Sequence, residues 1–283
     1  MTLAFGMQLP IQAQSTVFVE EWEKSAGAAE LKAVAQACDA SGFDYVAVCD
    51  HVAIPRSRAD AMSTTWYDTI ATLGWLAGVT ERVRLLSHVY VAAYRHPLQT
   101  AKSFATLDAL SGGRAILGVG AGHVEEEFDA LGVSFSDRGK LTDDAIDQVR
   151  IALADEWGTG DLGQRPRPVQ AAGLPIWVGG SSPAAIRRAA ARGDGWLPQG
   201  PPKEGMKPAI ERIKEMRAAA GRDTQPFTIG AFGPPGPPEK VAASIPYFEE
   251  LGVDQVQVRF PSTSCADLVD QIERFSALVT QPG

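Results

Sequence analysis

Short apolar runs alternate with helical segments along this chain, and this alternation limits the folds open to it more than any other feature. Residues 107–122, LDALSGGRAILGVGAG, show the pattern best. A helix ends, the chain turns at Gly112 and Gly113, and an apolar strand at 114–119 opens into a loop that contains glycine. Apolar runs of this kind are typical of parallel strands that helices cover on both faces.

Eight strands follow this pattern, and helices separate nearly all of them. The strands are predicted at 3–9, 45–49, 82–91, 114–119, 175–180, 195–197, 227–232 and 255–259. The helices are predicted at 25–40, 67–78, 95–112, 125–130, 137–153, from 183 onward, and at 207–220, 239–251 and 265–278.

The fold class follows from this count of β/α units. No break in composition marks a second domain, so we predict a single domain over residues 1–283. Eight units indicate a (β/α)8 TIM barrel, with insertions in the loops at the C-terminal ends of the strands. A doubly wound open sheet is the alternative fold.

Composition and charge exclude several classes of protein. Lys and Arg number 26 against 34 Asp and Glu, a net charge of −8, and no basic cluster points to nucleic acid. No run reaches the roughly 18 apolar residues of a membrane helix, and the N-terminus lacks the pattern of an export signal. The three cysteines have no C-x-x-C spacing, which favours a reduced compartment. We therefore expect a cytoplasmic protein that acts on a small molecule and binds neither nucleic acid nor a membrane.

The histidines do not form a metal motif. There are four of them, His51, His88, His96 and His123, and they show neither H-x-H nor H-E-x-x-H spacing. The acidic run at 125–127 fits a solvated helix face. We predict no metal site.

Polar residues and glycines follow four of the predicted strands. In a barrel, the active site lies at the C-terminal ends of the strands, so we expect these groups to converge on one mouth. The groups are Asp50 and His51 after the second strand, Ser87, His88 and Tyr90 late in the third, Gly120, Ala121, Gly122 and His123 after the fourth, and Gly179, Gly180, Ser181 and Ser182 after the fifth.

His51 is the strongest candidate for proton transfer. Imidazole titrates near neutral pH, and the neighbouring carboxylate of Asp50 can hold one tautomer. A structural Asp–His pair that caps the loop is the alternative.

Two glycine loops are candidates for ligand binding. Glycines 118, 120 and 122 do not match the spacing G-x-G-x-x-G, which argues against a Rossmann site, but they let backbone amides approach a flat ligand or a phosphate. The loop 179–182 offers amides and hydroxyls at the start of a helix, which favours an anion. An ordinary turn and ordinary helix capping are the alternatives.

Four stretches carry a resemblance to a known family. They are GFDYVAVCDH (42–51), RVRL (82–85), RHPLQTAKSFATLDALSGGRAILGVGAG (95–122) and PIWVGGSSPAAIRRAAARGDGWLP (175–198). Together they resemble the bacterial luciferase-like monooxygenase superfamily, and more closely its actinobacterial branch of coenzyme F420-dependent oxidoreductases.

The resemblance implies a barrel that holds a flavin or a 5-deazaflavin at the strand ends. It implies hydride transfer at ring carbon C5 of F420, while the protein orients the cofactor and handles protons. Asp50 and His51 match the pair beside the isoalloxazine ring, with His51 in the proton-transfer position. Ser87 and His88 match a bulge in the third strand that often contains a non-prolyl cis peptide.

The remaining matched residues are assigned to the cofactor on the same resemblance. Gly120, Ala121 and Gly122 would flank the ring and the cofactor side chain, and Gly179 and Gly180 the phosphate. Tyr90, His123, Ser181 and Ser182 complete the predicted cofactor site. The resemblance also allows a homodimer, for which the sequence defines no interface.

The sequence departs from the F420-dependent sugar-phosphate dehydrogenases at two places. His123 stands where those enzymes carry an acidic residue, and Ile54 and Pro55 stand where they carry an aromatic residue. We therefore do not expect glucose 6-phosphate as substrate. His123 is a candidate for a second proton-transfer role.

The expected function is hydride transfer between F420 and an unidentified organic substrate. An FMN-dependent luciferase-like monooxygenase and a non-catalytic flavin- or deazaflavin-binding protein are the alternatives. Four arginines in long loops, Arg56, Arg58, Arg165 and Arg167, are candidates to meet the anionic tail of F420. We also expect residues 157–172 to form a lid across the mouth.

Overall fold

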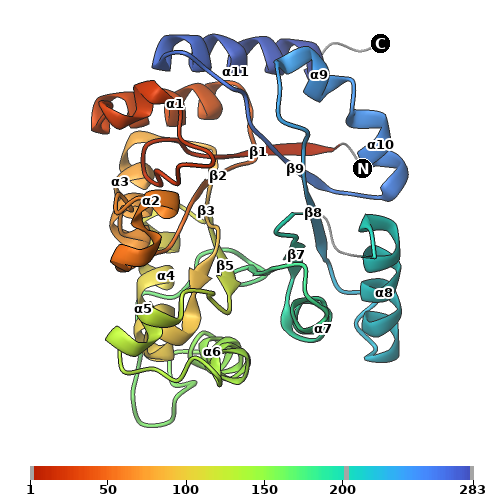
Figure 1. The fold of residues 1–283 in the computed structure, drawn as a ribbon. Helices are drawn as coiled ribbons and strands as arrows, with labels where there is room; N and C mark the ends of the chain where they lie inside the picture. The colour runs from red at the N-terminus through yellow and green to blue at the C-terminus, as the bar shows by residue number, and fades with distance from the viewer. Residues whose placement is uncertain (1–2, 201–203, 281–283) are drawn as a thin grey trace. The chain divides into compact units, whose positions relative to one another are not determined.

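The computed structural model describes residues 3–200 and 204–280 (Figure 1). These residues divide into two compact units. The first unit contains residues 3–86 and 230–280, and the second contains residues 87–200 and 204–229. The prediction of one domain over residues 1–283 stays a prediction.

The strands pair in an order that returns to its start. The described strands are β1 (Ala4–Gln8), β2 (Tyr45–Val48), β3 (Arg84–Ser87), β4 (Tyr90–Val91), β5 (Ala115–Gly120), β6 (Ile176–Gly179), β7 (Gly195–Leu197), β8 (Thr228–Phe232) and β9 (Gln255–Val258). Their order is β3-β2-β1-β9-β8-β7-β6-β5-β4, and β3 also pairs with β5. Since β3 and β4 together occupy the third position, this is the strand order of a (β/α)8 barrel, and the predicted fold class is confirmed.

Helices connect the strands in both units. The first unit contains η1 (Glu21–Lys24), α1 (Ala28–Ala40), η2 (Arg56–Arg58), α2 (Ala59–Met62), α3 (Thr69–Val79), α9 (Pro238–Ala242), α10 (Ile245–Leu251) and α11 (Cys265–Thr280). The second unit contains η3 (Ala92–Tyr94), α4 (Pro97–Ser111), α5 (Glu125–Ala130), α6 (Arg138–Ala152), α7 (Pro183–Arg192) and α8 (Met206–Ala219).

Three of the predicted elements differ from the structure. Helix α1 begins later than predicted, because the Glu30 side chain accepts the Gly27 amide at 2.9 Å and fixes the helix start there. The third strand is interrupted after Ser87. The predicted helix 239–251 is divided into α9 and α10, where Pro246 lies in the first turn of α10 and has no amide proton to continue a helix.

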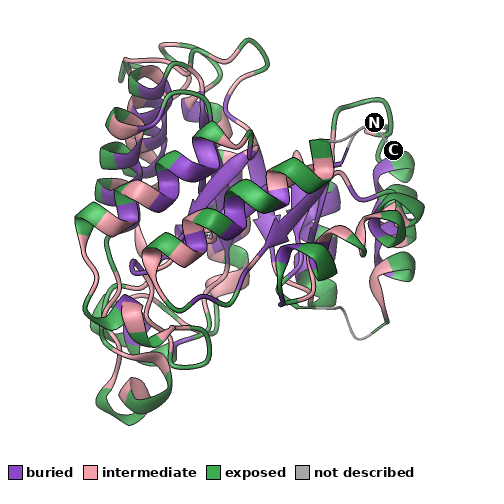
Figure 2. Ribbon diagram, turned by 90° about the horizontal axis from the view of Figure 1, so that it is seen from above, coloured by how far each residue is buried: buried purple, intermediate pink, exposed green. Residues whose placement is uncertain are grey.

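In the first unit, α11 packs beside α1 over the strands (Figure 1). Phe275 of α11 lies among three other rings, with centroid distances of 4.9 Å to Phe5, 5.3 Å to Phe260 and 6.1 Å to Phe43. These residues come from both ends of the chain. Figure 2 shows the consequence in the colouring, with buried strands and helices that are exposed on their outer side.

Buried aspartates tie the ends of two helices to the chain that follows. The Asp39 carboxylate, in the last turn of α1, accepts the backbone amides of Arg82 at 2.8 Å and Val83 at 2.6 Å, just before β3. Asp108, near the end of α4, accepts the amide of Val169 at 2.7 Å. Both carboxylates are buried, and each replaces the water that these amides lose.

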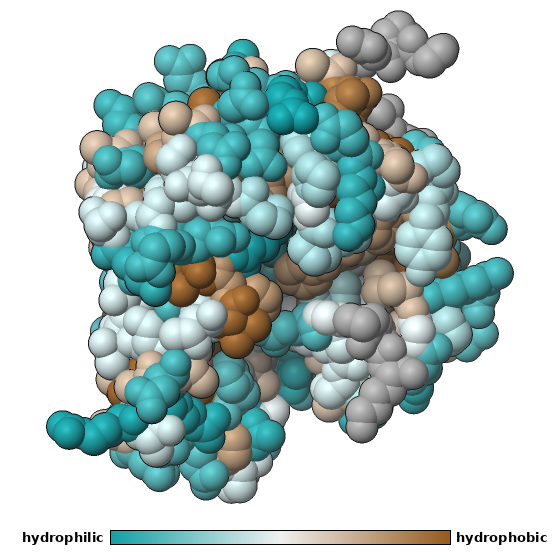
Figure 3. Space-filling model, turned by 45° about the horizontal axis from the view of Figure 1, so that its top comes forward, coloured by the Kyte–Doolittle hydropathy of each residue, from teal (hydrophilic) through white to brown (hydrophobic). Residues whose placement is uncertain are grey.

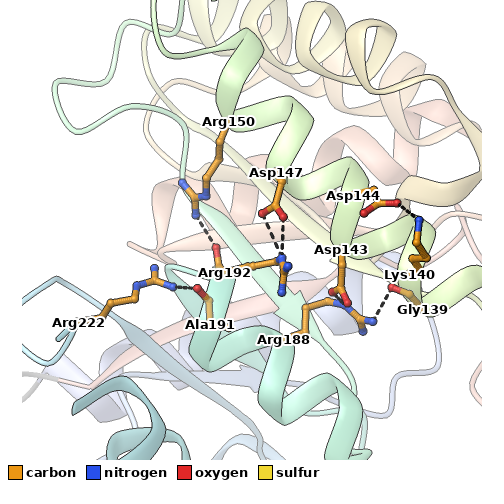
Figure 4. Close-up of polar contacts among 10 residues, drawn as sticks. All are labelled: Gly139, Lys140, Asp143, Asp144, Asp147, Arg150, Arg188, Ala191, Arg192 and Arg222. Atoms are coloured by element: carbon orange, nitrogen blue, oxygen red, sulfur yellow. Dashed lines mark hydrogen bonds and ion pairs between the residues drawn. The ribbon is translucent and has the colours of Figure 1, made fainter. Parts of the chain in front are cut away.

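In the second unit, opposite charges match along α6 and α7 (Figure 4). Arg188, which is nearly buried, lies 2.5 Å from Asp143, and Arg192 lies 3.0 Å from Asp147. Both acids are on α6 and both arginines on α7, each pair four residues along from the other. The repeated pairing fixes the register of one helix against the other.

One glycine of β1 is required by its neighbour in β2. Gly6 pairs with Tyr45 in the parallel register, and the buried Tyr45 ring lies across it. A Cβ atom on Gly6 would be 2.2 Å from Tyr45 Cζ. No side chain fits there without moving the ring.

We predict that Gly6→Ala lowers the free energy of unfolding by about 1–3 kcal/mol, because it overpacks this contact. Gly78→Ala is the matched control, since Gly78 is an exposed residue of α3 with nothing within 4 Å of the added atom. The control should gain about 0.5–1 kcal/mol from the helix preference of alanine. Urea unfolding of both variants measures this, and equal stability of Gly6→Ala and the wild type would contradict it.

Candidate active site

Asp50 and His51 lie one residue beyond the end of β2, after Cys49, and a residue of α3 holds Asp50. Thr69, the first residue of α3, places its Oγ1 2.7 Å from the Cys49 carbonyl oxygen and 3.0 Å from Asp50 Oδ1. Thr69 is fully buried and Asp50 is 4% exposed. The hydroxyl proton is therefore shared between two acceptors, and the Asp50 carboxylate is fixed beside a partly exposed His51.

Gln12 joins three segments around this position, and the sequence analysis missed it. Its Nε2 donates to the Leu9 carbonyl at 2.9 Å, and its Oε1 accepts the Cys49 amide at 3.1 Å. Its backbone carbonyl accepts the Tyr67 amide at 2.9 Å. The side chain is fully buried. A glutamine in a loop carries no sequence pattern that would reveal these partners.

Glu23 shapes the loop after β1 in the same unit. Its Oε2 accepts the Ile11 amide at 2.8 Å, and its Oε1 accepts the Glu20 amide at 3.0 Å. Ile11 has a φ of 71° and is fully buried. A β-branched residue rarely adopts this left-handed conformation, so the loop is held by its contacts and not by local preference.

An aromatic ring lies against His51. The centroids of His51 and Trp66 are 4.4 Å apart, with an angle of 63° between the ring planes. Trp66 lies between α2 and α3, well beyond Ile54 and Pro55. The sequence analysis did not connect this tryptophan to His51.

In the second unit, Ser87 is used by the sheet itself. Its hydroxyl donates to the Gly118 carbonyl at 2.9 Å and accepts the Gly118 amide at 3.0 Å. Ser87 is fully buried. The hydroxyl therefore takes the place of a backbone hydrogen-bonding partner for Gly118. Its predicted role toward a cofactor stays a prediction.

The non-prolyl cis peptide joins His88 and Val89, between β3 and β4. It follows the pair Ser87 and His88 that the resemblance placed on a bulge. Burial lowers the pKa of His88 to about 4. His88 is therefore neutral at pH 7 and offers no positive charge to a ligand.

Two of the predicted ligand-binding glycines make room for a side chain of the protein. A Cβ on Gly120 would lie 2.3 Å from Val89 Cγ2, and one on Gly179 would lie 2.4 Å from Val89 Cγ1. Gly122, with a φ of 74°, is similarly close to Phe128. The structure thus gives these glycines a packing role, and the predicted approach of a ligand to their backbone stays a prediction.

The loop 179–182 begins α7 as predicted, but several of its donors have partners within the protein. Ser182 accepts the Ala185 amide at 3.2 Å and caps the helix. The Gly180 amide donates to the Leu197 carbonyl at 2.9 Å. These groups are therefore engaged in strand pairing and helix capping.

Ser181 bridges the same loop to the chain after β7. Its hydroxyl donates to the Gly200 carbonyl at 2.8 Å and accepts the Gln199 amide at 2.9 Å. The Ser181 hydroxyl proton is thus used within the protein, whereas the Ser182 hydroxyl acts as an acceptor for the Ala185 amide. An anion here would depend on the backbone, on the Ser182 hydroxyl proton and on the N-terminal end of α7.

The other predicted residues of the second unit do not share one environment. The buried Tyr90 ring packs against Phe104 of α4, with centroids 5.3 Å apart, and the Arg95 guanidinium lies 4.3 Å from its centre. Ala121 is partly exposed and His123 is exposed, and both lie between β5 and α5. Tyr90 therefore belongs to the packing of β4 on α4.

Residues 157–172 do not form the predicted lid. Gln170 Nε2 donates to Asp108 Oδ1 at 2.7 Å and to the Ala115 carbonyl at 2.9 Å. Ala115 begins β5, whereas the predicted site residues follow its last residue, Gly120. The segment lies at the opposite end of the strand, because α6 returns the chain to where β6 starts. The lid prediction is wrong.

Two of the predicted tail-binding arginines are engaged inside this segment. Arg165 forms an ion pair with Glu156 at 2.6 Å, and Arg167 donates to the Asp155 carbonyl at 2.6 Å. They give no support to the predicted contact with F420. Arg56 and Arg58 lie in η2 of the first unit, and their role stays a prediction.

Within residues 3–200 and 204–280, no three or more His, Cys, Asp and Glu side chains lie close enough together to hold a metal ion. None of the helices that the structure describes is long and apolar enough to cross a membrane. On the face drawn in Figure 3, hydrophilic side chains predominate and hydrophobic ones form small separate groups. The homodimer stays a prediction.

The sequence model of the luciferase-like monooxygenase family matches residues 4–235. The chain therefore belongs to this family of oxidoreductases, which act on small molecules, and the predicted resemblance is confirmed. An uncharacterized protein of Mycobacterium tuberculosis (strain ATCC 25618 / H37Rv) is 31% identical over 245 residues, or 80% of this chain and 83% of the relative. The 5,10-methylenetetrahydromethanopterin reductase of Methanopyrus kandleri is 28% identical over 214 residues, or 68% of this chain and 58% of the reductase.

Solved structures share the fold along nearly the whole chain. An F420-dependent secondary alcohol dehydrogenase in complex with an F420–acetone adduct superposes with a TM-score of 0.77 at 17% identity, over 99% of this chain and 100% of that one. The EDTA monooxygenase of Chelativorans sp. BNC1 gives a TM-score of 0.80 at 11% identity, over 99% and 93%. At these identities the likeness shows the fold alone.

Removal of the Thr69 hydroxyl should destabilise the fold at the end of β2. We predict that Thr69→Val, which keeps the shape, lowers the free energy of unfolding by about 1–3 kcal/mol, because buried acceptors lose their donor. Thr69→Ser keeps the hydroxyl and is the matched control. Urea unfolding compares the two variants, and a valine variant as stable as the serine variant would refute the role given to this hydroxyl.

The burial of His88 predicts a pH dependence of stability. The unfolded chain binds this proton near its ordinary pKa of 6.5, but the folded protein only near pH 4. The free energy of unfolding therefore falls as the pH is lowered from 6.5 to 4, by at most about 3 kcal/mol from this residue.

His88→Gln should flatten this dependence, because glutamine does not titrate. Urea unfolding of wild type and variant at pH 7 and at pH 4.5 measures the difference. A variant as pH-dependent as the wild type would show that His88 does not cause the effect.

Proposed function

We propose that this protein is a cytoplasmic F420-dependent oxidoreductase that transfers a hydride between the deazaflavin and an organic substrate. The observation that carries the proposal is the arrangement after β2, where buried Asp50 is fixed by Thr69 beside a partly exposed His51. A fixed carboxylate next to an accessible imidazole suits proton transfer. A solved tetrahydromethanopterin reductase of Methanopyrus kandleri and the secondary alcohol dehydrogenase are both F420-dependent, which supports F420 as the proposed cofactor.

The imidazole of His51 and the carboxylate of Asp50 fit the proton transfer that accompanies deazaflavin chemistry. When bound, F420 would supply hydride exchange at C5 of its ring. His51 would give or take the accompanying proton at its imidazole, and Asp50 would hold the imidazole in one tautomer. His123, exposed after β5, is a second proton-transfer candidate.

The cofactor phosphate is proposed to bind at the start of α7. The Ser181 hydroxyl proton is used within the protein, so the backbone amides of Ser181 and Ser182, the Ser182 hydroxyl proton and the positive end of the helix would hold the anion.

A fluorescence titration of the purified protein with F420 and, separately, with FMN tests the cofactor. We expect binding of F420 at micromolar concentration or tighter, and much weaker binding of FMN. Binding of FMN alone, together with oxygen uptake when reduced FMN is supplied, would replace the proposal by a flavin-dependent monooxygenase. Binding of neither would overturn it.

His51→Asn tests the chemistry separately from binding. In a substrate screen that follows F420 absorbance, this variant should bind F420 and lose about 10²- to 10⁴-fold in turnover, the usual contribution of a general acid or base. A variant that changes only the affinity for F420 would indicate a non-catalytic carrier.

A further inference from the structure

Trp66 is tied to the backbone at several points in the first unit. Its Nε1 lies 3.1 Å from the carbonyl oxygens of both Met62 and Ser63, at the end of α2. Its backbone forms an antiparallel bridge with Ala13. The next residue, Tyr67, donates its amide to the Gln12 carbonyl at 2.9 Å. The indole therefore has little freedom to move.

The indole is the fixed partner in its contact with His51. The two rings meet in a T-shaped arrangement, with centroids 4.4 Å apart and an angle of 63° between the planes. Both residues are partly exposed.

We infer that Trp66 is a positioning residue for His51 and holds the imidazole in the orientation that proton transfer uses. The inference rests on the proposed function, because it is His51 that would move the proton. Beyond the area it buries, an aromatic pair stabilises the contact of the two rings by a factor of roughly two to ten. Trp66 acts on the imidazole ring, whereas Thr69 acts on the carboxylate of Asp50, so the two residues fix different groups of the site.

Histidine-selective NMR tests this contact without substrate or turnover. Protein labelled with ¹³C and ¹⁵N in histidine alone has four labelled residues, and His51→Asn identifies the His51 signals. In Trp66→Leu, the His51 signals should lose the displacement caused by the indole ring current, while the other three histidines stay in place. Trp66→Phe should keep part of the displacement, and it serves where the leucine variant fails to fold.

Trp22→Leu is the matched control. Trp22 is a partly exposed tryptophan of the same unit, and its Nε1 donates to Ser262 Oγ at 3.1 Å. This substitution should leave the His51 signals unmoved. Unchanged His51 signals in Trp66→Leu, or equal changes in the Trp22→Leu control, would overturn the positioning role.

Titration with F420 separates failure of this inference from failure of the proposed function. F420 should displace the His51 signals of the wild type. Trp66→Leu should weaken F420 binding by roughly two- to tenfold, and Trp66→Leu combined with His51→Asn should bind no more weakly than His51→Asn alone.

Two outcomes of the titration are then distinct. A further loss of affinity in the double variant would show that Trp66 acts independently of His51 and would overturn the inference alone. His51 signals that F420 does not move would overturn the proposed function and the role of Trp66 with it, even where the ring contact itself is present.

Discussion

At the end of β2, folding removes the Cys49 backbone amide from water, and this amide donates instead to the buried carboxamide oxygen of Gln12. Much of the candidate site depends on this kind of exchange, because a buried polar group without a partner is costly. Thr69 does the same for Asp50, and Ser87 does so for Gly118 in the second unit. The strand ends are thus held by side chains from distant parts of the sequence, which leaves the functional side chains in fixed positions.

Close packing explains a second set of residues. Gly120 and Gly179 leave space for Val89, and Gly6 leaves space for the Tyr45 ring. Glycine at such places suggests ligand binding when only the sequence is known, since a close approach of backbone and ligand also needs a missing Cβ. Here the group that approaches is a side chain of the same protein.

The functional interpretation rests on the first unit more than on the second. There Thr69 holds the Asp50 carboxylate, and the imidazole of the next residue, His51, lies against the Trp66 ring. Membership in the luciferase-like monooxygenase family supplies the class of chemistry. In the second unit, several of the predicted groups around α7 and β5 have partners within the protein, and their role toward a cofactor stays a prediction.

The sequence by itself determined the elements whose signals are local. Apolar runs and helix caps identified the β/α alternation, the start of α7 at Ser182 and the turn at Gly112, because neighbouring residues decide these features. It also placed Asp50 and His51 at a strand end. Only the tertiary structure decided which distant groups meet: Gln12 with Cys49, Trp66 with His51, and Gln170 with Ala115. The last of these contacts lies at the start of β5, not at its end, where the lid was predicted. Such contacts depend on burial and on partners far along the chain, and no local pattern encodes them.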